Sequence, residues 1–509
     1  MEKTNTAIEL KGIRKVFGNV VANDEVDLSV REGEILALLG ENGSGKTTLM
    51  NMLSGIYQPD GGSIFVNGQK AHINSPEDSK KLGIGMIHQH FKLIELFSGV
   101  DNVLLGSNKD NLFLTKKRVK TVTESVKQFG LNVDLSKKVY DMSVSEKQSV
   151  EIIKVLFNGA KILILDEPTA VLTPQETRVL FDILRNMKKS GCAIVIITHK
   201  LNEVMEISDR VTILRKGKSV ATVNTAETDA QKLTELMVGH AVELSIDRPE
   251  VEIENKSLFS VHHLVVENEE KINAINDISF ELYRGEILGV AGVAGSGQKE
   301  LCEAIAGLQK VKKGAILYEK ENIVQKTPRE IIKLGISMSF IPEDRLGMGL
   351  SASMGIRDNM MLKNYRSAKG PFVDRKTASA QAKRVIGQYD ISAPDIVTPV
   401  SRLSGGNVQK VLLGREIEAE PNVIITAYPV RGLDINSSYT VYNALNDQKK
   451  KGAGVLFIGE DLDVMLELCD RIMVLCHGEI TGIVDAKTAT KEQIGLLMTN
   501  SVKEGTENE

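Results

Sequence analysis

The stretch of sequence that decides the fold is Ile35-Leu-Ala-Leu-Leu-Gly-Glu-Asn-Gly-Ser-Gly-Lys-Thr-Thr-Leu-Met-Asn-Met-Leu53. Its first five residues are continuously apolar, which is typical of a parallel strand buried on both faces. Residues Gly40–Thr47 fit the phosphate-binding pattern GxxxxGK[ST] without a mismatch, and Thr47–Leu53 is predicted to be a helix. A strand, this loop and a helix in that order indicate an α/β unit that holds phosphates at a helix N-terminus.

The loop supplies most of the candidate nucleotide-binding residues. Its glycines let backbone N–H groups approach phosphates, Lys46 provides a charge for the β- and γ-phosphates, and Thr47 offers a hydroxyl to Mg²⁺. A glycine-rich turn that binds nothing is the alternative, but the flanking strand and helix favour a nucleotide site. The predicted contacts are Gly40, Glu41, Asn42, Gly43, Ser44, Gly45, Lys46, Thr47 and Thr48.

A second apolar run, Lys161-Ile-Leu-Ile-Leu165, is followed directly by Asp166 and Glu167. We predict a second buried parallel strand here, and ligands of such sheets bind outside the carboxyl ends of the strands. Asp166 is expected to help hold Mg²⁺, and Glu167 to orient or deprotonate the attacking water. A solvated strand end is the alternative, which the neighbouring phosphate loop makes the weaker interpretation.

Three further residues are assigned to this site by their positions. His199 follows a third apolar strand and is predicted to sense the γ-phosphate, although a histidine at a strand end is by itself more often structural. Gln89 stands where a strand meets a loop and is placed to reach Mg²⁺ or water. Phe17 is placed to stack on adenine, with core packing as the open alternative. His88 and His90 lack a third nearby ligand, so we expect no separate metal site there.

The chain is internally repeated. Gly33-Glu-Ile-Leu-Ala-Leu-Leu-Gly40 reappears 252 residues later as Gly285-Glu-Ile-Leu-Gly-Val-Ala-Gly292, and Asp209-Arg-Val211 reappears 261 residues later as Asp470-Arg-Ile472. A nearly constant spacing of this kind indicates two copies of one unit. The 509 residues alone would suggest about three or four domains. The repeat instead predicts two, at residues 1–245 and 246–509.

Together with Leu403-Ser-Gly-Gly-Asn-Val-Gln-Lys410, these motifs resemble the signature set of ABC-type ATPases. The Asn407 form of that segment is similar to the double-length ATPases of bacterial sugar and nucleoside importers, over about residues 7–500. His88-Gln-His-Phe91 and Gly297-Gln298 are more similar to the nucleoside (basic membrane protein-associated) branch than to the ribose or galactose branch.

The resemblance implies a fold, cofactors and partners. The fold is two tandem P-loop domains, each a parallel-sheet nucleotide core with an antiparallel β subdomain and a helical subdomain. The cofactors are ATP and Mg²⁺, with each ATP held between the phosphate loop of one copy and the signature residues of the other. The intact signature residues are Ser404, Gly405 and Gly406. The implied partners are two separate membrane permeases and, indirectly, an extracytoplasmic solute-binding protein.

The second copy lacks the chemistry of the first. At the positions of Lys46, Thr47, Gln89, Asp166, Glu167 and His199, the repeat places Gln298, Lys299, Glu343, Ala427, Tyr428 and Glu460. Losing all of them removes the charge stabilisation on which phosphoryl transfer depends. The signature has the opposite asymmetry, because the first copy reads Met142-Ser-Val-Ser145. We therefore expect one hydrolytic and one degenerate ATP site.

Composition limits the remaining classes of function. The net charge is −4, with no basic surplus to attract nucleic acid. No run of about 18 apolar residues exists, so we expect no membrane span. The resemblance implies a transport ATPase at the cytoplasmic face of the membrane that energises uptake of a nucleoside. Simple-sugar uptake is the alternative, and a soluble tandem ATPase acting on ribosomes is a remote one.

Overall fold

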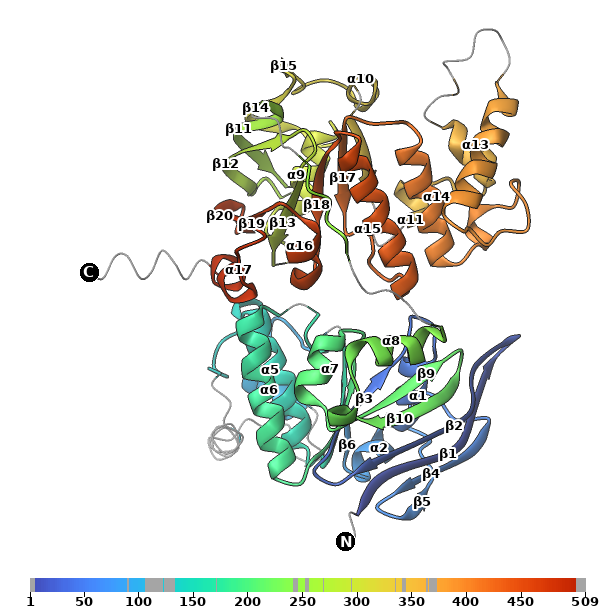
Figure 1. The fold of residues 1–509 in the computed structure, drawn as a ribbon. Helices are drawn as coiled ribbons and strands as arrows, with labels where there is room; N and C mark the ends of the chain where they lie inside the picture. The colour runs from blue at the N-terminus through green and yellow to red at the C-terminus, as the bar shows by residue number, and fades with distance from the viewer. Residues whose placement is uncertain are drawn as a thin grey trace. The chain divides into compact units, whose positions relative to one another are not determined.

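The chain folds into two units, unit 1 (Met1–Glu243) and unit 2 (Leu244–Glu509) (Figure 1). The computed structural model describes residues 5–88, 91–105, 122, 133–170, 172–240, 246–251, 256–268, 270–293, 295–334, 336–340, 345–362, 365 and 373–499. Gln89, His90 and Glu343 lie outside these ranges.

Unit 1 alternates strands and helices along the chain. Its strands are β1 (Thr6–Phe17), β2 (Val20–Arg31), β3 (Ile35–Leu39), β4 (Gly61–Val66), β5 (Gln69–Ala71), β6 (Ile84–Ile87), β7 (Ile162–Asp166), β8 (Ala193–Ile197), β9 (Arg210–Arg215) and β10 (Lys218–Asn224). Its helices are α1 (Lys46–Leu53), α2 (Pro76–Lys81), α3 (Gly99–Leu105), α5 (Val144–Phe157), α6 (Pro174–Lys189), α7 (Leu201–Ile207) and α8 (Ala230–Val238).

Unit 2 repeats this order of strands and helices among the described residues. Its strands are β11 (Ser257–Glu267), β12 (Asn273–Tyr283), β13 (Ile287–Gly292), β14 (Val311–Tyr318), β15 (Glu321–Asn322), β16 (Ile336–Phe340), β17 (Val423–Ala427), β18 (Gly454–Ile458), β19 (Arg471–Cys476) and β20 (Glu479–Asp485). Its helices are α9 (Gln298–Ile305), α10 (Pro328–Lys333), α11 (Arg345–Met348), α12 (Ile356–Met361), α13 (Arg375–Gln388), α14 (Gly405–Ile417), α15 (Ile435–Lys450), α16 (Leu462–Leu468) and α17 (Lys491–Met498).

Both units contain the same two sheets. Unit 1 has a six-stranded sheet in the order β10-β9-β3-β8-β7-β6 and a four-stranded sheet in the order β2-β1-β4-β5. Unit 2 has the matching orders β20-β19-β13-β18-β17-β16 and β12-β11-β14-β15. The larger sheet is parallel except at β10 or β20, and the smaller sheet is antiparallel. The predicted α/β fold, a parallel core with an antiparallel β part in each of two repeats, is confirmed.

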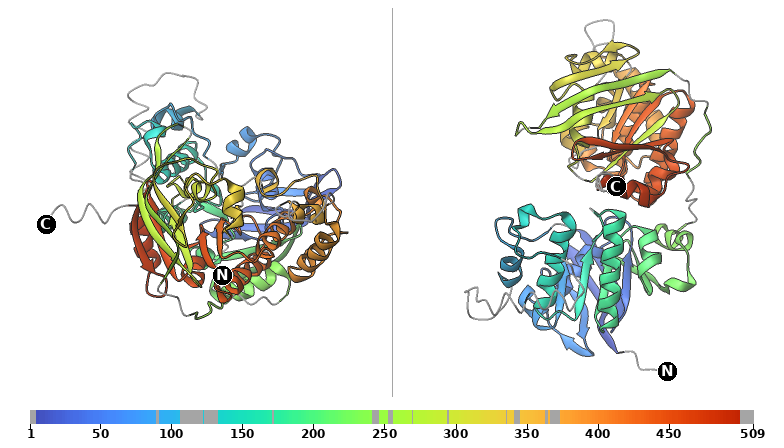
Figure 2. Two further views of the ribbon diagram at one scale, coloured as in Figure 1. Left: turned by 90° about the horizontal axis from the view of Figure 1, so that it is seen from above. Right: turned by 90° about the vertical axis from the view of Figure 1, so that its left-hand side faces the viewer.

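The predicted strand Ile35–Leu39 is confirmed as β3, and its side chains show why the run is continuously apolar. Leu36 and Leu38 pack with the smaller sheet and α1, whereas Ile35 packs with residues of α3, α5 and α6. Both faces of the strand are therefore buried, so neither face carries polar residues. Figure 1 shows these layers of unit 1, and Figure 2 shows them from two other directions.

The helix after the loop begins one residue earlier than predicted, at Lys46. Gly45, at the N-cap, has a φ of 96°, which is a left-handed conformation that glycine adopts without a steric penalty. The turn is thus completed at Gly45, and helical geometry starts with the lysine itself.

A lysine–aspartate pair ties the last turn of a long helix to the start of a strand in both units. Lys188 Nζ lies 2.5 Å from Asp209 Oδ1 in unit 1, and Lys449 Nζ lies 2.7 Å from Asp470 Oδ1 in unit 2. The lysine side chain is 33% exposed in unit 1 but only 1% exposed in unit 2. The two units therefore bury the same pair to different degrees.

The segment Ile246–Val251, called the strap, lies beside this pair in unit 2, where strap residues and Asp470 line one cavity. The amide of Asn446 donates to the carbonyl oxygen of Asp247 at 3.1 Å, and Arg248 donates to the carbonyl oxygens of Leu466 and Cys469. These carbonyls lie at the C-terminal end of α16, where cationic side chains are favoured. The strap thus lies along unit 2 beside the lysine–aspartate pair.

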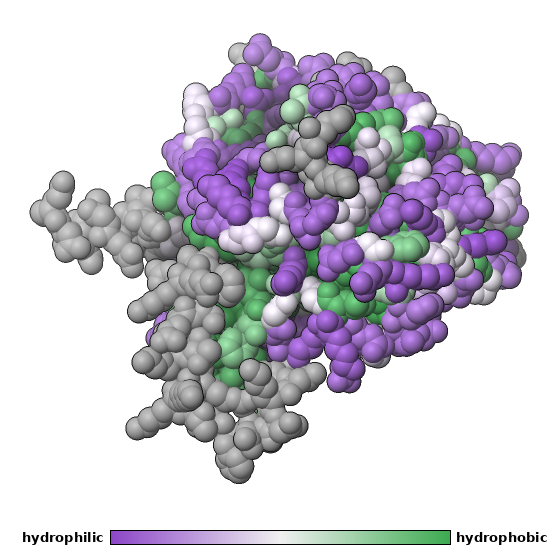
Figure 3. Space-filling model, turned by 90° about the horizontal axis from the view of Figure 1, so that it is seen from below, coloured by the Kyte–Doolittle hydropathy of each residue, from purple (hydrophilic) through white to green (hydrophobic). Residues whose placement is uncertain are grey.

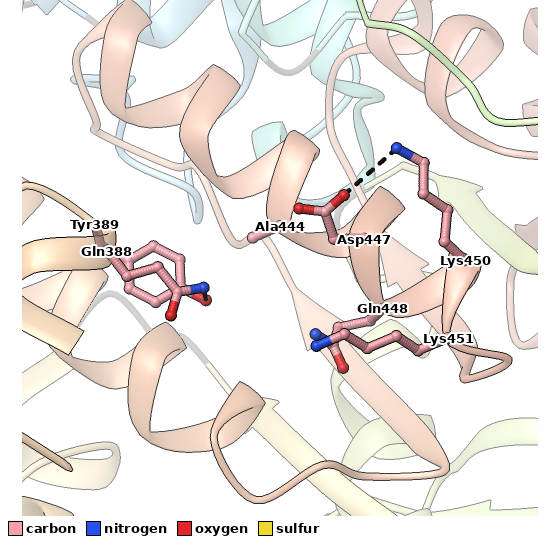
Figure 4. Close-up of a pocket in the computed structure, with 7 residues that line it drawn as sticks. All are labelled: Gln388, Tyr389, Ala444, Asp447, Gln448, Lys450 and Lys451. Atoms are coloured by element: carbon pink, nitrogen blue, oxygen red, sulfur yellow. Dashed lines mark hydrogen bonds and ion pairs between the residues drawn. The ribbon is translucent and has the colours of Figure 1, made fainter. Parts of the chain in front are cut away.

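Within the described ranges, no helix is long and apolar enough to cross a membrane, and the face drawn in Figure 3 is mostly hydrophilic with smaller hydrophobic areas. A cavity of about 270 Å³ lies in unit 2 (Figure 4) and contains none of the predicted site residues. Its lining residues are Gln388, Tyr389, Ala444, Asp447, Gln448, Lys450 and Lys451.

Candidate nucleotide site

The loop between β3 and α1 is shaped by two glycines that approach neighbouring backbone. A Cβ atom on Gly45 would lie 2.3 Å from the carbonyl oxygen of Ala22, and one on Gly40 would lie 2.3 Å from that of Leu214. Any larger residue at these two positions would displace the loop. The loop also buries the hydroxyl of Ser44, which has no hydrogen-bond partner among the described residues. A buried hydroxyl of this kind is suited to donate to a ligand.

Lys46 is folded back onto this loop. Its Nζ donates to the carbonyl oxygens of Gly40 at 2.6 Å and Glu41 at 2.9 Å, and the side chain is buried. Burial lowers the pKa of Lys46, while the carboxylates of Glu167 and Asp166 oppose that shift. The ammonium group therefore lies against the loop, near the two carboxylates at the carboxyl end of β7. Asn42, Gly43 and Thr47 are exposed, and Glu41 and Thr48 are half-buried.

The metal candidates Thr47 and Asp166 lie together, as predicted from separate parts of the sequence. Thr47 Oγ1 is 3.5 Å from Asp166 Oδ2, because α1 starts beside the carboxyl end of β7. Burial, and then the neighbouring charge of Glu167, raise the pKa of Asp166 to about 6. The two adjacent carboxylates thus concentrate negative charge next to a hydroxyl, which is the donor set that Mg²⁺ prefers.

Glu167 and His199 form a hydrogen-bonded pair at the ends of neighbouring strands. His199 Nδ1 lies 2.9 Å from Glu167 Oε1, and this bond is the main cause that lowers the pKa of Glu167. Glu167 has a φ of 46°, an uncommon conformation for a residue with a side chain, and its N–H donates to Ile197 at 2.8 Å. The carboxylate of Glu167 is therefore ionised and oriented by His199. The two residues are 32 positions apart in the sequence.

Phe17 lies on the surface of unit 1, which removes core packing as its role. Its side chain is 41% exposed at the end of β1, with its ring 5.2 Å from that of Tyr57 in an edge-on arrangement. Lys15 Nζ bonds to Asp60 Oδ1 at 3.0 Å, and Asp60 also accepts the N–H of Val16 at 2.7 Å. The ring contact with Tyr57 and the bonds that join Asp60 to Lys15 and Val16 were not predicted from the sequence.

Unit 2 keeps the loop but fills it differently. Gly297 takes the same left-handed conformation as Gly45, with a φ of 102°. The side chain of Gln298 is buried and its Nε2 donates to the carbonyl oxygen of Val293 at 3.2 Å. A neutral carboxamide thus stands where unit 1 has an ammonium group.

The strand ends of unit 2 have the same backbone and different chemistry. Tyr428 has a φ of 52°, and its N–H donates to Ile458 at 2.8 Å, as Glu167 does to Ile197. The neighbouring Ala427 carries no carboxylate. Glu460 lies 3.4 Å from Arg431 Nε, and burial raises the pKa of Tyr428 to about 12. Unit 2 therefore has no ionised carboxylate at the Asp166 and Glu167 positions.

Comparison with known proteins agrees with this geometry. The family model for ABC transporters matches residues 23–170 and 275–429, one match in each unit. This chain belongs to the ABC transporter family. It is an ATP-binding ATPase of that family.

Several relatives of this ABC ATPase match nearly its full length. A nucleoside import ATP-binding protein of Lactococcus lactis subsp. cremoris is 40% identical, and the match covers 97% of this chain and 98% of the relative. A guanosine import ATP-binding protein of Bacillus subtilis is 41% identical, with the same coverage. A ribose import ATP-binding protein of Streptomyces avermitilis is 37% identical, covering 98% and 94%.

A solved structure shares the fold of the whole chain. An archaeal ribosome recycling factor, in complex with a ribosomal stalk protein, matches with a TM-score of 0.58 over 91% of this chain and 87% of that one. The identity is only 16%, so the likeness concerns the fold alone.

The ABC signature residues of unit 2 lie at a helix N-terminus. Ser404 is the N-cap of α14, and its hydroxyl accepts from Asn407 Nδ2 at 2.8 Å. Ser404 and Gly405 are exposed, and Gly406 is half-buried against Asp434 and Ser437. The exposed N–H groups of this turn are therefore open to an anion.

Proposed function

We propose that this chain is the ATP-hydrolysing subunit of an importer that takes up a nucleoside through two separate membrane permeases. The proposal is supported by near-full-length identity of about 40% to proteins that are named as nucleoside and guanosine importers. A sugar importer is the second candidate, because a relative named for ribose import is 37% identical. The chain would act at the cytoplasmic face of the membrane, with a solute-binding protein on the other side.

The observation that supports the proposed mechanism is that the two units have the same backbone conformation at the site but different side chains. Unit 1 brings Lys46, Asp166, Glu167 and His199 to one edge of its sheet. At the matching positions, unit 2 has side chains that provide neither the ammonium group nor the paired carboxylates. We propose that ATP is hydrolysed at unit 1 and that unit 2 carries a degenerate site.

Each group of unit 1 has a proposed role. Lys46 would exchange the loop carbonyls for the β- and γ-phosphates of ATP. Glu167, held ionised by His199, would orient the attacking water and accept its proton. With Nδ1 donating to Glu167, His199 would contact the γ-phosphate through Nε2 as the doubly protonated imidazolium, in which both ring nitrogens are donors. Phe17 would stack on the base.

Mg²⁺ fits the remaining groups. The adjacent carboxylates of Asp166 and Glu167 carry the negative charge that a divalent cation would neutralise, and the hydroxyl of Thr47 lies beside Asp166. Thr47, Asp166 and Gln89 would hold the ion. When bound, Mg²⁺ supplies charge stabilisation for the phosphates.

The signature residues Ser404, Gly405 and Gly406 are proposed to complete the competent site by donating to the γ-phosphate of the bound ATP. The exposed N-terminus of α14 supports this role. A Ser404→Arg substitution would then reduce ATP turnover, although it lies in the unit that lacks the catalytic groups.

Steady-state ATP hydrolysis by paired variants tests the single-site mechanism. Glu167→Gln keeps the shape of the side chain but removes the base, so turnover should fall by at least about 100-fold. Tyr428→Phe is the matched change in unit 2 and should leave turnover within about twofold of the parent. Substantial turnover in Glu167→Gln would show that the assigned site is not the hydrolytic one.

Uptake by whole cells tests the solute. A strain that carries Glu167→Gln in place of the parent protein should lose uptake of labelled nucleosides and keep uptake of labelled ribose. The reverse pattern would favour the sugar importer. Co-sedimentation of the chain with ribosomes rather than membranes would instead support the ribosomal alternative.

A further inference from the structure

A polar network not used in the mechanism above joins the segment after Glu167 to the segment after His199. Thr169 Oγ1 donates to Glu203 Oε2 at 2.6 Å, and Thr169 is 2% exposed. Lys200 Nζ donates to the carbonyl oxygen of Thr169 at 3.2 Å and lies 3.1 Å from Glu203 Oε1. These three residues form a second connection beside the direct bond between Glu167 and His199.

The network uses a helix start in an unusual way. Lys200 is the N-cap of α7 but makes no side-chain cap bond, although Ser, Thr, Asp and Asn are the residues that favour this position. Glu203, in the first turn, reaches Thr169 and Lys200 instead of the backbone of its own helix. Helix α7 thus begins without a side-chain cap, and Glu203 in its first turn binds the loop that contains Thr169.

In unit 2 the matching helix, α16, begins without such a network. The residues matching Thr169, Lys200 and Glu203 are Val430, Asp461 and Val464. Asp461 caps α16 in the usual way by accepting the N–H of Asp463 at 2.9 Å. By contrast, the bond from Gln148 to the carbonyl of Pro168 has a counterpart in unit 2, from Gln409 to Pro429. Of these two connections, the Gln148 bond is kept in unit 2 and the Thr169 network is absent, as are the catalytic groups.

We propose that Thr169, Lys200 and Glu203 are positioning residues that hold Glu167 and His199 in hydrogen-bonding register during ATP hydrolysis. Tyr428 has the same positive φ as Glu167 without such a network, so the proposed role concerns the two side chains and not the backbone conformation. The network fixes the chain two residues after Glu167 and one residue after His199. This inference rests on the proposed function, because it assumes that the Glu167–His199 pair acts in hydrolysis.

The first test separates kcat from KM. Thr169→Val removes the hydroxyl without changing the shape of the side chain, and it introduces the residue type that unit 2 has. We expect kcat for ATP hydrolysis to fall about tenfold with KM for ATP little changed, because displaced catalytic groups lose rate more than binding. Thr169→Ser keeps a hydroxyl and should restore most of kcat.

The control is Thr225→Val, which removes a buried hydroxyl at the other end of α7. Thr225 Oγ1 lies 2.8 Å from Ser208 Oγ, so the two variants lose comparable bonds in the same unit. Thr225→Val should keep the parent kcat even if its melting temperature falls. If both variants lower the melting temperature equally and neither changes kcat, the network is structural only and the proposal is overturned.

A double-variant cycle tests whether Thr169 affects kcat through His199. In a His199→Ala background the pair no longer exists, so Thr169→Val should add less than about a twofold loss of kcat. A full tenfold loss in that background would overturn positioning through His199. Parent-like turnover in Glu167→Gln would refute the proposed hydrolytic site itself. Loss in Glu167→Gln with a normal Thr169→Val would refute only the network.

Discussion

Replacing Asp166 with asparagine should stabilise unit 1 while it abolishes function. In the folded unit the pKa of this carboxyl rises from 3.8 to about 6, chiefly because it is buried and secondly because Glu167 is adjacent. A raised carboxyl pKa means that folding disfavours the charged form. At about 1.36 kcal/mol per pKa unit, the charge of Asp166 destabilises the folded state by up to about 3 kcal/mol at neutral pH.

The sign of the pH dependence follows from the two pKa values. Below about pH 4 the carboxyl is neutral in both states and the charge penalty is absent, whereas above about pH 6 it is charged in both and the penalty is complete. The advantage of Asp166→Asn should therefore grow between about pH 4 and 6 and then stay constant. Lys46 and Thr47 lose a partner in the variant, so we expect a gain of about 1–3 kcal/mol at pH 7.5.

Hydrogen exchange of the full chain, without nucleotide or metal, measures this gain in unit 1 alone through peptides from β3 and β7. Their protection should be higher in Asp166→Asn at pH 7.5, and the difference should shrink at pH 4.5 after correction for the intrinsic rate. Asp182→Asn removes an exposed carboxylate of α6 and serves as the control. A destabilised Asp166→Asn, or a difference that does not depend on pH, would refute the reasoning.

Two further predictions concern the edge of the nucleotide site. Phe17→Ala should raise KM for ATP about tenfold with little change in kcat, since a lost aromatic stack is worth about 1–1.5 kcal/mol. An unchanged KM in a steady-state titration would rule out base stacking. Lys15→Glu and Asp60→Lys should each lower the melting temperature, and the double variant should recover part of the loss. The reason is that unit 2 has an ion pair at the matching positions with the charges reversed, between Glu267 and Lys312. A double variant less stable than either single variant in differential scanning calorimetry would contradict this.

The parts of the fold that were predicted from the sequence are those encoded by local pattern. Five buried apolar residues before a glycine-rich loop identify β3, since only a strand covered on both faces needs such a run. The repeat spacing then transfers this assignment to β13. Parallel topology brings Asp166 to the loop without further information, because the carboxyl ends of parallel strands share one edge of the sheet.

Side-chain partners were predicted poorly because they depend on packing between distant segments. The bond between Glu167 and His199 spans 32 residues, and the Thr169–Glu203 bond spans 34. Phe17 could not be placed in the core or on the surface until β1 was seen to end beside Tyr57. The network of Thr169 did have a signal in the sequence, since all three of its positions differ between the copies together with the catalytic ones.

The strap has a consequence for where the chain can be divided. A fragment that starts at Lys256 would contain every described strand of unit 2 yet would lack the strap residues beside Asp470 and the bond from Arg248 to the end of α16. A fragment that starts at Ile246 would retain both. Residues 246–251 thus belong structurally to the second repeat. Exchange of first units between related chains should accordingly join them before residue 246, so that each second unit keeps the segment that seals it.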